Sequence, residues 1–436
     1  MNKRTLAISI IIPTHNRCNA LKRALDALSN QTFSPEQFEV VIVADGCTDD
    51  TLEMLGYYNA PFRLHVIEQS NQGPAGARNH GADNASGRLL IFLDDDVESS
   101  PSLVEAHLSA HQRYPHHVVI GYYPTVVHDH SNFFQTEIRS WWEAMFSTMR
   151  HPGHRYTYRN LLSGNLSMDA ELFARIGGFD QNLVVHEDWE LGLRLIKARV
   201  PFIHASDAIG YHHETSNLER ILQRKYQEGR ADVLIGKRHP ELNADGPLAD
   251  RVSKPGSWQR ILRNVAFGLP RVGNVFVSSS RLILALLEFA RLRPNWRSLL
   301  GALLYYHYWL GIKEELGKQR TLTNFLPVGL ESNRLDEEMK IDLRDGLEAA
   351  EQLLDEKRPA GASIRYGRHK LGRIPAQPGA EPLRGVHLRP ILASQLAKPL
   401  FKAMALEGAF GGFPNVILAI VACGLESQEP IDACLP

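Results

Sequence analysis

One nine-residue segment limits the folds open to this chain more than any other. Residues 89–97 read Leu-Leu-Ile-Phe-Leu-Asp-Asp-Asp-Val, so five apolar residues run directly into three aspartates. The apolar run is too short for a typical helix and lies between Gly87 and Pro101, which predicts a buried strand. Three carboxylates at the end of a buried strand need a neutralising partner. Carboxylate oxygens suit Mg²⁺ or Mn²⁺, and the alternative is a solvated acidic loop.

The first hundred residues alternate between strand and helix patterns. Strands are predicted at 8–12, 38–43, 64–68 and 89–93, and helices at 20–28, from 48 onward and at 73–85. This alternation predicts an α/β fold with a doubly wound, mostly parallel sheet flanked by helices. Ligands of such sheets bind at the carboxyl ends of the strands, where residues 13–17, Asp45 and Asp94–Asp96 fall. Three polar segments therefore converge on one crevice.

Length and composition exclude several classes of protein. The chain has 436 residues, enough for two or three domains, and 44% of them are hydrophobic, so a sizeable core can form. The formal net charge is -1, so we expect no nucleic-acid partner. Its four cysteines lack the spacing of a metal site and fit a reducing cytosol. The apolar run 6–12 lacks a signal-peptide cleavage site, and the expected location is cytoplasmic.

Four short blocks together resemble a known family. Residues 9–17 read SIIIPTHNR, 41–49 VIVADGCTD, 71–79 NQGPAGARN and 92–96 FLDDD. In this order and spacing they resemble the inverting family-2 glycosyltransferases with the GT-A fold. The resemblance covers residues 1–240, divided into a nucleotide-binding half (1–100) and an acceptor half (101–240). One departure is Ala44, where the family often has a second aspartate.

The resemblance implies roles for the donor side of the site. Pro13, Thr14, Asn16 and Arg17 would line the pocket for base and ribose, and Asp45 would accept a hydrogen bond from the base. Asp94 would face the ribose, with Asp95 in the same nucleotide-sugar site, and Asp96 would hold Mn²⁺ or Mg²⁺. Gly76 would leave room for backbone to approach the ligand, and Arg78 would stabilise the expelled diphosphate. Close packing of a helix on the sheet would explain the glycine at position 76 equally well.

A second polar cluster lies at residues 162–214. Asp or Glu in the first turn of a helix usually only caps it, but here Glu187 and Asp188 follow Gly-Gly-Phe-Asp in a pattern that resembles the family's acceptor region. The resemblance makes Asp188 the general base, supported by Glu187. It also implies an acceptor site and a second metal ligand. The acceptor residues are Asn165, Gly178, Phe179 and Trp189, and the ligand is His212, with His213 as the alternative.

The predicted function is metal-dependent, inverting transfer of one sugar. The donor would be a nucleoside diphosphate sugar, with UDP favoured, and the acceptor a hydroxyl of a glycan or lipid-linked precursor. The Gln-x-x-Arg-Trp motif of processive synthases has no match near Gln223–Gln227. A sugar-nucleotide nucleotidyltransferase would need a Gly-rich, basic loop after the first strand, which residues 13–17 do not supply. A non-catalytic sugar-nucleotide-binding protein would be expected to lose the acidic motifs, and both are present.

The remaining sequence divides into a helical region at 241–320 and a C-terminal extension at 321–436. We expect a linker at 243–257, apolar helices at 272–292 and 296–316, and a charged helix at 335–357. These would suit a helical cap, a homodimer contact or peripheral binding at the inner face of the plasma membrane. The basic segment 220–238 would support such membrane contact. Loop or disorder is predicted at 358–389, and 410–424 is too short to span a membrane.

Overall fold

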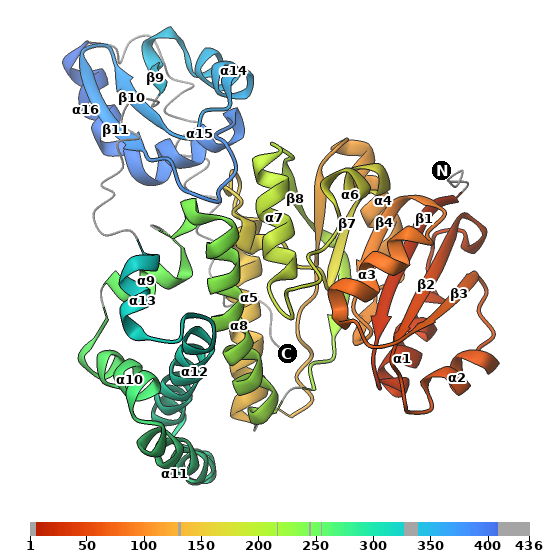
Figure 1. Ribbon diagram of the computed structural model, residues 1–436. Helices are drawn as coiled ribbons and strands as arrows, with labels where there is room; N and C mark the ends of the chain where they lie inside the picture. Colours follow the sequence, from red (N-terminus) through yellow and green to blue (C-terminus); the bar gives the residue numbers. More distant parts are fainter. Residues whose placement is uncertain are drawn as a thin grey trace. The chain divides into compact units, whose positions relative to one another are not determined.

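The structure is a computed structural model that describes residues 6–129, 132–215, 217–243, 246–253, 255–326 and 339–408 (Figure 1). The chain forms two compact units. The first comprises Met1–Phe146 and Tyr158–Val328, and the second comprises Ser147–Thr157 and Gly329–Pro436. The predicted boundaries near residues 240 and 320 stay a prediction.

The first unit is built on an eight-stranded mixed sheet. Its strand order is β3-β2-β1-β4-β7-β6-β8-β5. The strands are β1 (Leu6–Thr14), β2 (Phe38–Asp45), β3 (Arg63–Gln69), β4 (Gly87–Leu93), β5 (Val97–Ser99), β6 (Val118–Tyr122), β7 (Asn165–Asp169) and β8 (Phe202–His212). Strands β1 to β4 pair in parallel, as the alternating pattern predicted.

The parallel strands end in polar residues for a physical reason. β2 is buried along its whole length, and so is β4 except at Arg88, because helices cover the sheet. In register, Ile11 of β1 lies between Val41 of β2 and Phe92 of β4, so the carboxyl ends of the three strands meet at one edge. The predicted α/β fold class is confirmed.

Helices cover the sheet and position the loops around its edge. They are α1 (Cys18–Leu28), α2 (Thr51–Tyr57), α3 (Gly73–Asp83), α4 (Leu103–Arg113), α5 (Phe133–Arg150), α6 (Ala170–Ile176) and α7 (Glu187–Lys197). Helix α3 packs on β1 and β2, and α4 packs on β6 and β8. The close approach of α3 depends on Gly81, where a Cβ would lie 2.6 Å from Ile11 Cγ2.

The acceptor half adds a strand of opposite direction. β7 pairs antiparallel with both β4 and β6, and it places Asn165 beside Leu93 at the end of β4. The loop before β7 therefore runs next to the aspartates that follow β4, and the amide of Asp94 donates to the carbonyl of Gly164 at 3.2 Å. This antiparallel insertion joins β4 to the acceptor half, and β8 pairs with β5 at a second seam.

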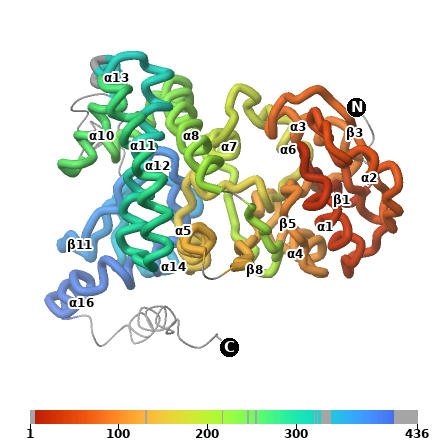
Figure 2. Tube along the Cα trace, turned by 90° about the horizontal axis from the view of Figure 1, so that it is seen from below, coloured from red at the N-terminus to blue at the C-terminus, as the bar shows by residue number. Residues whose placement is uncertain are grey.

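A helical bundle completes the first unit. It consists of α8 (Leu218–Arg238), α9 (Pro247–Ser253), α10 (Ser257–Gly268), α11 (Pro270–Phe289), α12 (Arg293–Leu316) and α13 (Gln319–Phe325). Helices α8 and α12 lie side by side in both views (Figures 1 and 2), and their backbones approach at glycines. A Cβ at Gly229 of α8 would lie 2.1 Å from the carbonyl oxygen of Tyr308. The linker predicted at 243–257 contains α9, whose Leu248 is buried in the bundle core.

The bundle has one helix with unusual exposure. By length and composition α11 could cross a membrane, with a mean hydropathy of 1.4, and only 17% of that window is buried. No other described helix has this property. Arg281 and Glu288 interrupt the apolar run of this helix.

The second unit has its own three-stranded sheet and core. Its elements are β9 (Met339–Asp342), α14 (Leu347–Lys357), β10 (Ala362–Tyr366), β11 (His369–Ile374), α15 (Gly385–Ile391) and α16 (Ala397–Leu406). The prediction of loop or disorder at 358–389 is wrong, because β10, β11 and the start of α15 lie there. The missed signal was the alternation of Ala362, Ile364 and Tyr366, which are all buried. The apolar segment 410–424 lies outside the described residues.

Candidate active site

A cavity of about 680 Å³ opens at the carboxyl ends of β1, β2 and β4. Most of the residues predicted to bind ligand line it, and they come from segments far apart in the sequence. Those on the cavity wall are Pro13, Thr14, Arg17, Asp45, Arg78, Asp94, Asp95, Asp96, Glu187, Asp188, Trp189 and His212. The convergence predicted from strand ends is observed, because members of all three segments, 13–17, Asp45 and Asp94–Asp96, line one cavity.

The three aspartates after β4 have different partners. Arg17 bridges two of them, because its Nη1 lies 3.0 Å from Asp95 Oδ1 and 2.5 Å from Asp96 Oδ2. Thr14 Oγ1 also donates to Asp95 Oδ2 at 2.8 Å. Asp94 instead accepts from Arg78 Nη2 at 2.7 Å. Arg17 therefore neutralises two carboxylates here, a role that differs from the base and ribose contact expected of it.

Burial and neighbouring charge separate the pKa values of Asp95 and Asp96. Burial, with the nearby carboxylates of Asp96 and Asp94, raises the pKa of Asp95 to about 7 despite Arg17. Burial acts in the same direction on Asp96, but the hydrogen bond and charge of His212, together with Arg17, lower its pKa to about 2. Asp96 is thus the carboxylate that stays ionised across the ordinary pH range.

Asp45 holds the loop before α3. Its Oδ1 accepts from the amide of Gln72 at 2.7 Å and from Gln69 Nε2 at 2.8 Å, and its Oδ2 accepts from the amide of Gly73 at 2.9 Å. Gly73 has a φ of +76°, a left-handed conformation that favours glycine. Asp45 therefore fixes this turn at the cavity wall, and its Oδ2 keeps one lone pair for a ligand.

Arg78 joins the donor and acceptor parts of the cavity. Its guanidinium is buried, and it donates from Nη1 to Glu187 Oε1 and from Nη2 to Asp94 Oδ1, both at 2.7 Å. The guanidinium also lies over the ring of Phe179, 5.5 Å from its centroid. A single cation from α3 therefore holds together one acid that follows β4 and one acid that begins α7.

Asp188 sits in the first turn of α7 with its carboxylate in the cavity. It accepts from the amides of Ser163 at 3.3 Å and Trp189 at 2.8 Å. Burial and the adjacent Glu187 raise the pKa of Asp188 to about 6, against the opposing effect of His186 and Arg78. A carboxylate with such a pKa is ionised at neutral pH and basic enough to accept a proton.

His186 fixes the start of α7 in a strained conformation. Its φ of +62° lies in the left-handed region, which is uncommon for a residue other than glycine. Its Nδ1 lies 3.1 Å from Asp232 Oδ1, and Tyr308 donates to Asp232 Oδ2 at 2.6 Å. The imidazole also stacks on Trp189, with 3.7 Å between ring centroids. Helices α8 and α12 thus hold the residue that precedes Glu187.

Asp96 and His212 offer two neighbouring ligands to a divalent cation. His212 Nε2 lies 3.4 Å from Asp96 Oδ1 and 4.0 Å from Glu214 Oε2, so imidazole and carboxylate donors converge. His212 Nδ1 is buried without a hydrogen-bond partner among the described residues. Within those residues no cluster of three or more His, Cys, Asp or Glu forms a complete metal cage. The residues present fit a cation that takes its other ligands from substrate oxygens.

The charge of the cavity wall favours such a cation. Eight acidic side chains face five Lys and Arg side chains, an excess of three acids. The acids are Asp45, Asp94, Asp95, Asp96, Glu187, Asp188, Glu214 and Glu228, and the bases are Arg17, Arg78, Arg224, Lys225 and Arg251. This wall would repel an anionic substrate unless positive charge were added. His213, the alternative ligand, contacts Glu98 Oε2 at 2.8 Å and does not line the cavity.

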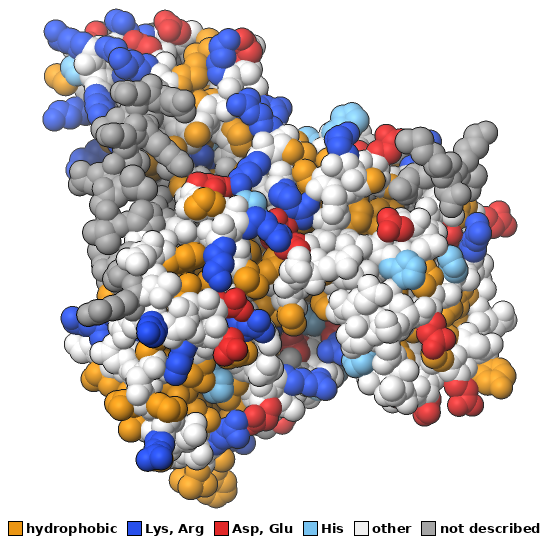
Figure 3. All heavy atoms as spheres, in the orientation of Figure 1, with side chains coloured by type: hydrophobic (Ala, Val, Ile, Leu, Met, Phe, Trp, Pro, Cys, Tyr) orange, Lys and Arg blue, Asp and Glu red, His pale blue; other side chains and the backbone are white. Residues whose placement is uncertain are grey.

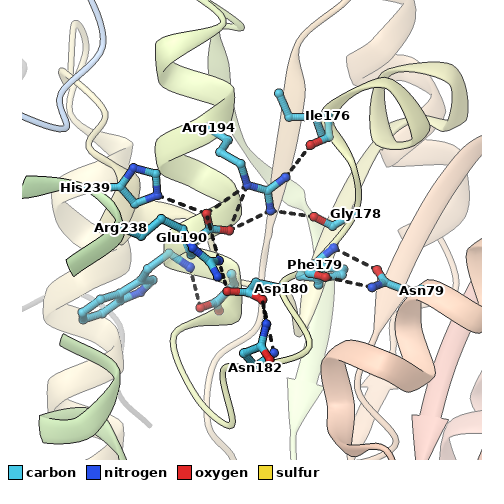
Figure 4. Close-up of polar contacts among 12 residues, drawn as sticks. Asn79, Ile176, Gly178, Phe179, Asp180, Asn182, Glu190, Arg194, Arg238 and His239 are labelled. Atoms are coloured by element: carbon cyan, nitrogen blue, oxygen red, sulfur yellow. Dashed lines mark hydrogen bonds and ion pairs between the residues drawn. The ribbon is translucent and has the colours of Figure 1, made fainter. Parts of the chain in front are cut away.

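The Gly-Gly-Phe-Asp turn is held by a polar network behind the cavity (Figure 4). Arg194 of α7 donates to the carbonyls of Ile176 at 2.5 Å and Gly178 at 2.6 Å, and it pairs with the buried Glu190. Asn79 of α3 exchanges two hydrogen bonds of 2.8 Å with the backbone of Phe179. Arg238 forms an ion pair with Asp180. The turn is thereby fixed to α3, α7 and α8.

Three predicted acceptor residues are corrected by this packing. Asn165 is fully buried, and its side chain bonds His107 Nε2 at 2.8 Å and the carbonyl of Ala208 at 2.9 Å. Gly178 lies against Asn79, where a Cβ would meet Oδ1 at 2.6 Å. Phe179 packs in the core against Phe92. None of the three lines the cavity, so they support the site from behind.

Two predicted donor residues are also placed outside the cavity wall. Asn16 accepts at Oδ1 from the amides of Thr48 at 2.7 Å and Asp49 at 3.2 Å, which ties the loop after β1 to the loop after β2. Gly76 faces Gln72, where a Cβ would lie 2.8 Å from Gln72 Cβ. Their contribution is to loop and helix packing.

Several lining residues were missed by sequence reasoning. They are Tyr123, Trp141, Trp142 and Met145 beside or on α5, His186, and Arg224, Lys225 and Glu228 on α8. The paired tryptophans on an amphipathic helix were a signal for the first group. The expectation that 220–238 forms a basic membrane face stays a prediction. Within that segment Arg230 pairs with Glu315 at 2.8 Å, and Lys225 pairs with Glu228 at 2.5 Å.

The chain was compared with known protein families and sequences. Residues 9–177 match glycosyl transferase family 2, and residues 143–216 match a family described as the N-terminal domain of galactosyltransferase. Validoxylamine A glucosyltransferase of Streptomyces hygroscopicus subsp. limoneus is 32% identical over 266 residues, which cover 54% of this chain and 57% of that relative. The chain thus spans little more than half of this relative's length.

A more distant relative and one solved structure complete the comparison. Glycosyltransferase AglE of Haloferax volcanii is 24% identical over 238 residues, covering 52% of this chain and 73% of that relative. Among solved structures, the mannosyltransferase PcManGT from Pyrobaculum calidifontis, in complex with GDP-Man and Mn²⁺, is similar with a TM-score of 0.47 and 16% identity. The match covers 73% of this chain and 90% of that one.

Proposed function

Since residues 9–177 match glycosyl transferase family 2, we propose that this chain transfers a single sugar from a nucleoside diphosphate sugar to an acceptor hydroxyl. This match supports the family and the enzyme class expected from the sequence, and the activity with its details below is our proposal. The observation that carries it is the double ion pair of Arg78. It links Asp94, on the donor side, to Glu187, which directly precedes the proposed base.

The donor would occupy the wall formed by β1, β2 and the loop before α3. Pro13, Thr14 and Asp45 line this wall, and Asp45 Oδ2 would accept a hydrogen bond from the base. Arg78, with a guanidinium that is buried and fixed, would stabilise negative charge as the diphosphate leaves. The favoured nucleotide is UDP.

Asp96 and His212 would hold Mn²⁺ or Mg²⁺. Asp96 stays ionised at neutral pH, and its contact with Arg17 would have to exchange when a cation binds. A divalent cation bound there would neutralise charge on the diphosphate oxygens. The sugar would remain on the side of the cavity that faces α7.

Asp188 would act as the general base for the acceptor. A base on the face opposite the leaving diphosphate removes the hydroxyl proton as the acceptor attacks, which inverts the anomeric centre. Glu187 is held by Arg78, so it would orient the first turn of α7 and leave Asp188 as the free carboxylate. The raised pKa of Asp188 suits this role.

The acceptor would bind between α5 and α7. Trp141 is half-exposed at 52%, and it lines the cavity together with Trp189. Exposed indole rings bind the apolar faces of sugars, which suits a glycan or a lipid-linked acceptor. Transfer of one sugar fits the absence of a Gln-x-x-Arg-Trp motif after α7.

Titration calorimetry with a panel of UDP-, GDP- and dTDP-sugars, each with and without Mn²⁺, tests the proposal. We expect one donor to bind with an affinity that falls when the metal is chelated. Product analysis then identifies the reaction, because glycosyl transfer releases a nucleoside diphosphate from the donor, whereas a nucleotidyltransferase given the same sugar nucleotide and pyrophosphate forms a nucleoside triphosphate and a sugar 1-phosphate. Binding without turnover on any glycan or lipid acceptor would instead indicate a non-catalytic binding protein.

A further inference from the structure

Helix α11 presents an apolar outer face to solvent. Val275, Leu282, Leu286 and Phe289 follow one another at spacings of three, four or seven residues, so they form one stripe. Their exposed fractions are 69%, 66%, 57% and 89%. On the neighbouring α10, Ile261 and Trp258 are also exposed. We call these six residues the apolar face. Exposed apolar side chains in a stripe along one helix, with more on the helix before it, mark an interaction site.

The opposite side of α11 is fixed to the protein. Gly273, Ser280 and Leu284 are buried, and a Cβ at Gly273 would lie only 1.8 Å from Tyr306 Oη of α12. Arg281, near the middle of the helix, donates to Glu219 Oε2 of α8 at 2.7 Å. A helix tied at its middle to the catalytic unit cannot cross a bilayer, although its length and hydropathy would allow it. It can only lie along a surface.

The charges on residues 257–297 are mostly positive, and three of them, Arg281, Arg293 and Arg297, are paired with Glu219 of α8 and Glu137 of α5. Residues 257–297 contain seven arginines and one glutamate, with no lysine and no aspartate. The glutamate, Glu288, is used internally, because its Oε1 accepts from the amide of Phe133 at 3.2 Å. Figure 3 shows hydrophobic side chains interspersed with Lys and Arg at the lower end of the molecule, where Figure 1 places α10 and α11.

This charge pattern selects the partner. Two copies of the chain meeting through the apolar face would bring arginines against arginines, which opposes a symmetric dimer. An apolar stripe flanked by arginines instead matches an anionic bilayer, where side chains enter the acyl boundary and guanidinium groups contact phosphates. We propose that the apolar face binds the surface of an anionic phospholipid membrane, with α11 lying parallel to that surface.

Vesicle flotation of the full chain tests the proposal. Vesicles of phosphatidylcholine with phosphatidylglycerol are compared with phosphatidylcholine alone, at low salt and at about 0.5 M NaCl. We expect binding to the anionic vesicles at low salt, weakened by salt. The triple variant Leu282→Ser, Leu286→Ser, Phe289→Ser should reduce the bound fraction about tenfold or more, as should Arg260→Glu with Arg271→Glu.

The matched control is Tyr57→Ser, which removes an aromatic side chain that is 84% exposed on α2 and should leave binding unchanged. Melting temperature and donor affinity, measured on each preparation, show that the variants are folded, and they also keep this test separate from the proposed reaction. Absence of wild-type binding at low salt overturns the proposal. So does a dimer in light scattering that the triple variant converts to a monomer, or release from the membrane by detergent alone.

Discussion

At the scale of single residues, the most consequential property is the raised pKa of Asp188. Removal of this base should depress turnover more than donor binding, because the lost interaction acts only as the acceptor proton leaves. For Asp188→Asn we expect turnover to fall on the order of 10²–10⁴-fold with donor affinity retained. The measurement is steady-state turnover and donor calorimetry on one preparation, with the exposed Asp26→Asn as control.

The same pKa predicts opposite trends for activity and stability. The folded protein binds a proton at Asp188 more readily than the unfolded chain, so stability falls as pH rises from about 4 to 6. Wild-type turnover should decline as pH drops below about 6, when the base becomes protonated. At neutral pH, Asp188→Asn should raise the free energy of unfolding by on the order of 1–3 kcal/mol, and so raise the melting temperature above that of wild type. A lower melting temperature with normal turnover would mean that Asp188 only caps α7.

Asp96 provides a test of the metal site. Asp96→Asn keeps the size of the side chain but removes an anionic oxygen beside His212. We expect the gain in donor affinity that Mn²⁺ gives to wild type to fall about tenfold or more, with little change in melting temperature. Donor titrations with Mn²⁺ and with a chelator measure this gain. Full activity with unchanged metal dependence would place the metal elsewhere.

At the scale of elements, the strands and helices of residues 1–100 were predictable because their signals are local. Apolar runs such as 38–43 and polar residues at strand ends are read directly from short windows. The roles of Asn165, Gly178 and Phe179 were not predictable, since each is decided by a distant partner. Asn165 bonds His107, 58 positions earlier in the chain, and Phe179 bonds Asn79, 100 positions earlier.

The turn at residues 177–180 gives a prediction at this scale. Arg194 donates to the carbonyls of Ile176 and Gly178 at this turn, and it neutralises Glu190, which is only 1% exposed. Arg194→Ala should lower stability by about 2–4 kcal/mol, because a buried carboxylate and two carbonyls lose a charged donor. Chemical denaturation measures the loss. The exposed Arg175→Ala on α6 is the matched control, and an equal effect of the two substitutions would show that the network contributes little.

At the scale of the whole molecule, the two units have separate hydrophobic cores. The second core contains Ile364, Leu388 and Leu400, all from residues after 339. Chains with two cores often unfold in more than one step. We expect two calorimetric transitions, of which only that of the first unit rises when donor and Mn²⁺ are added.

A substitution in the second core assigns the transitions. Leu388→Ala should lower the free energy of unfolding of the second unit by about 2–5 kcal/mol, so the transition that does not respond to donor moves to a lower temperature. Donor affinity should not change. One cooperative transition that shifts as a whole with donor would contradict this division.

The seam between β4 and β7 has a consequence for recombination among related enzymes. The nucleotide-binding half ends with β5, and the acceptor half pairs with it through β7 beside β4 and through β8 beside β5, so a crossover after residue 100 has two strand pairings to preserve. Arg78 and Glu187 lie on opposite sides of that crossover. Exchange of acceptor halves between relatives should therefore succeed where both halves keep this pair. Where one half lacks its member of the pair, the hybrid contains a buried, unpaired charge and should fold poorly.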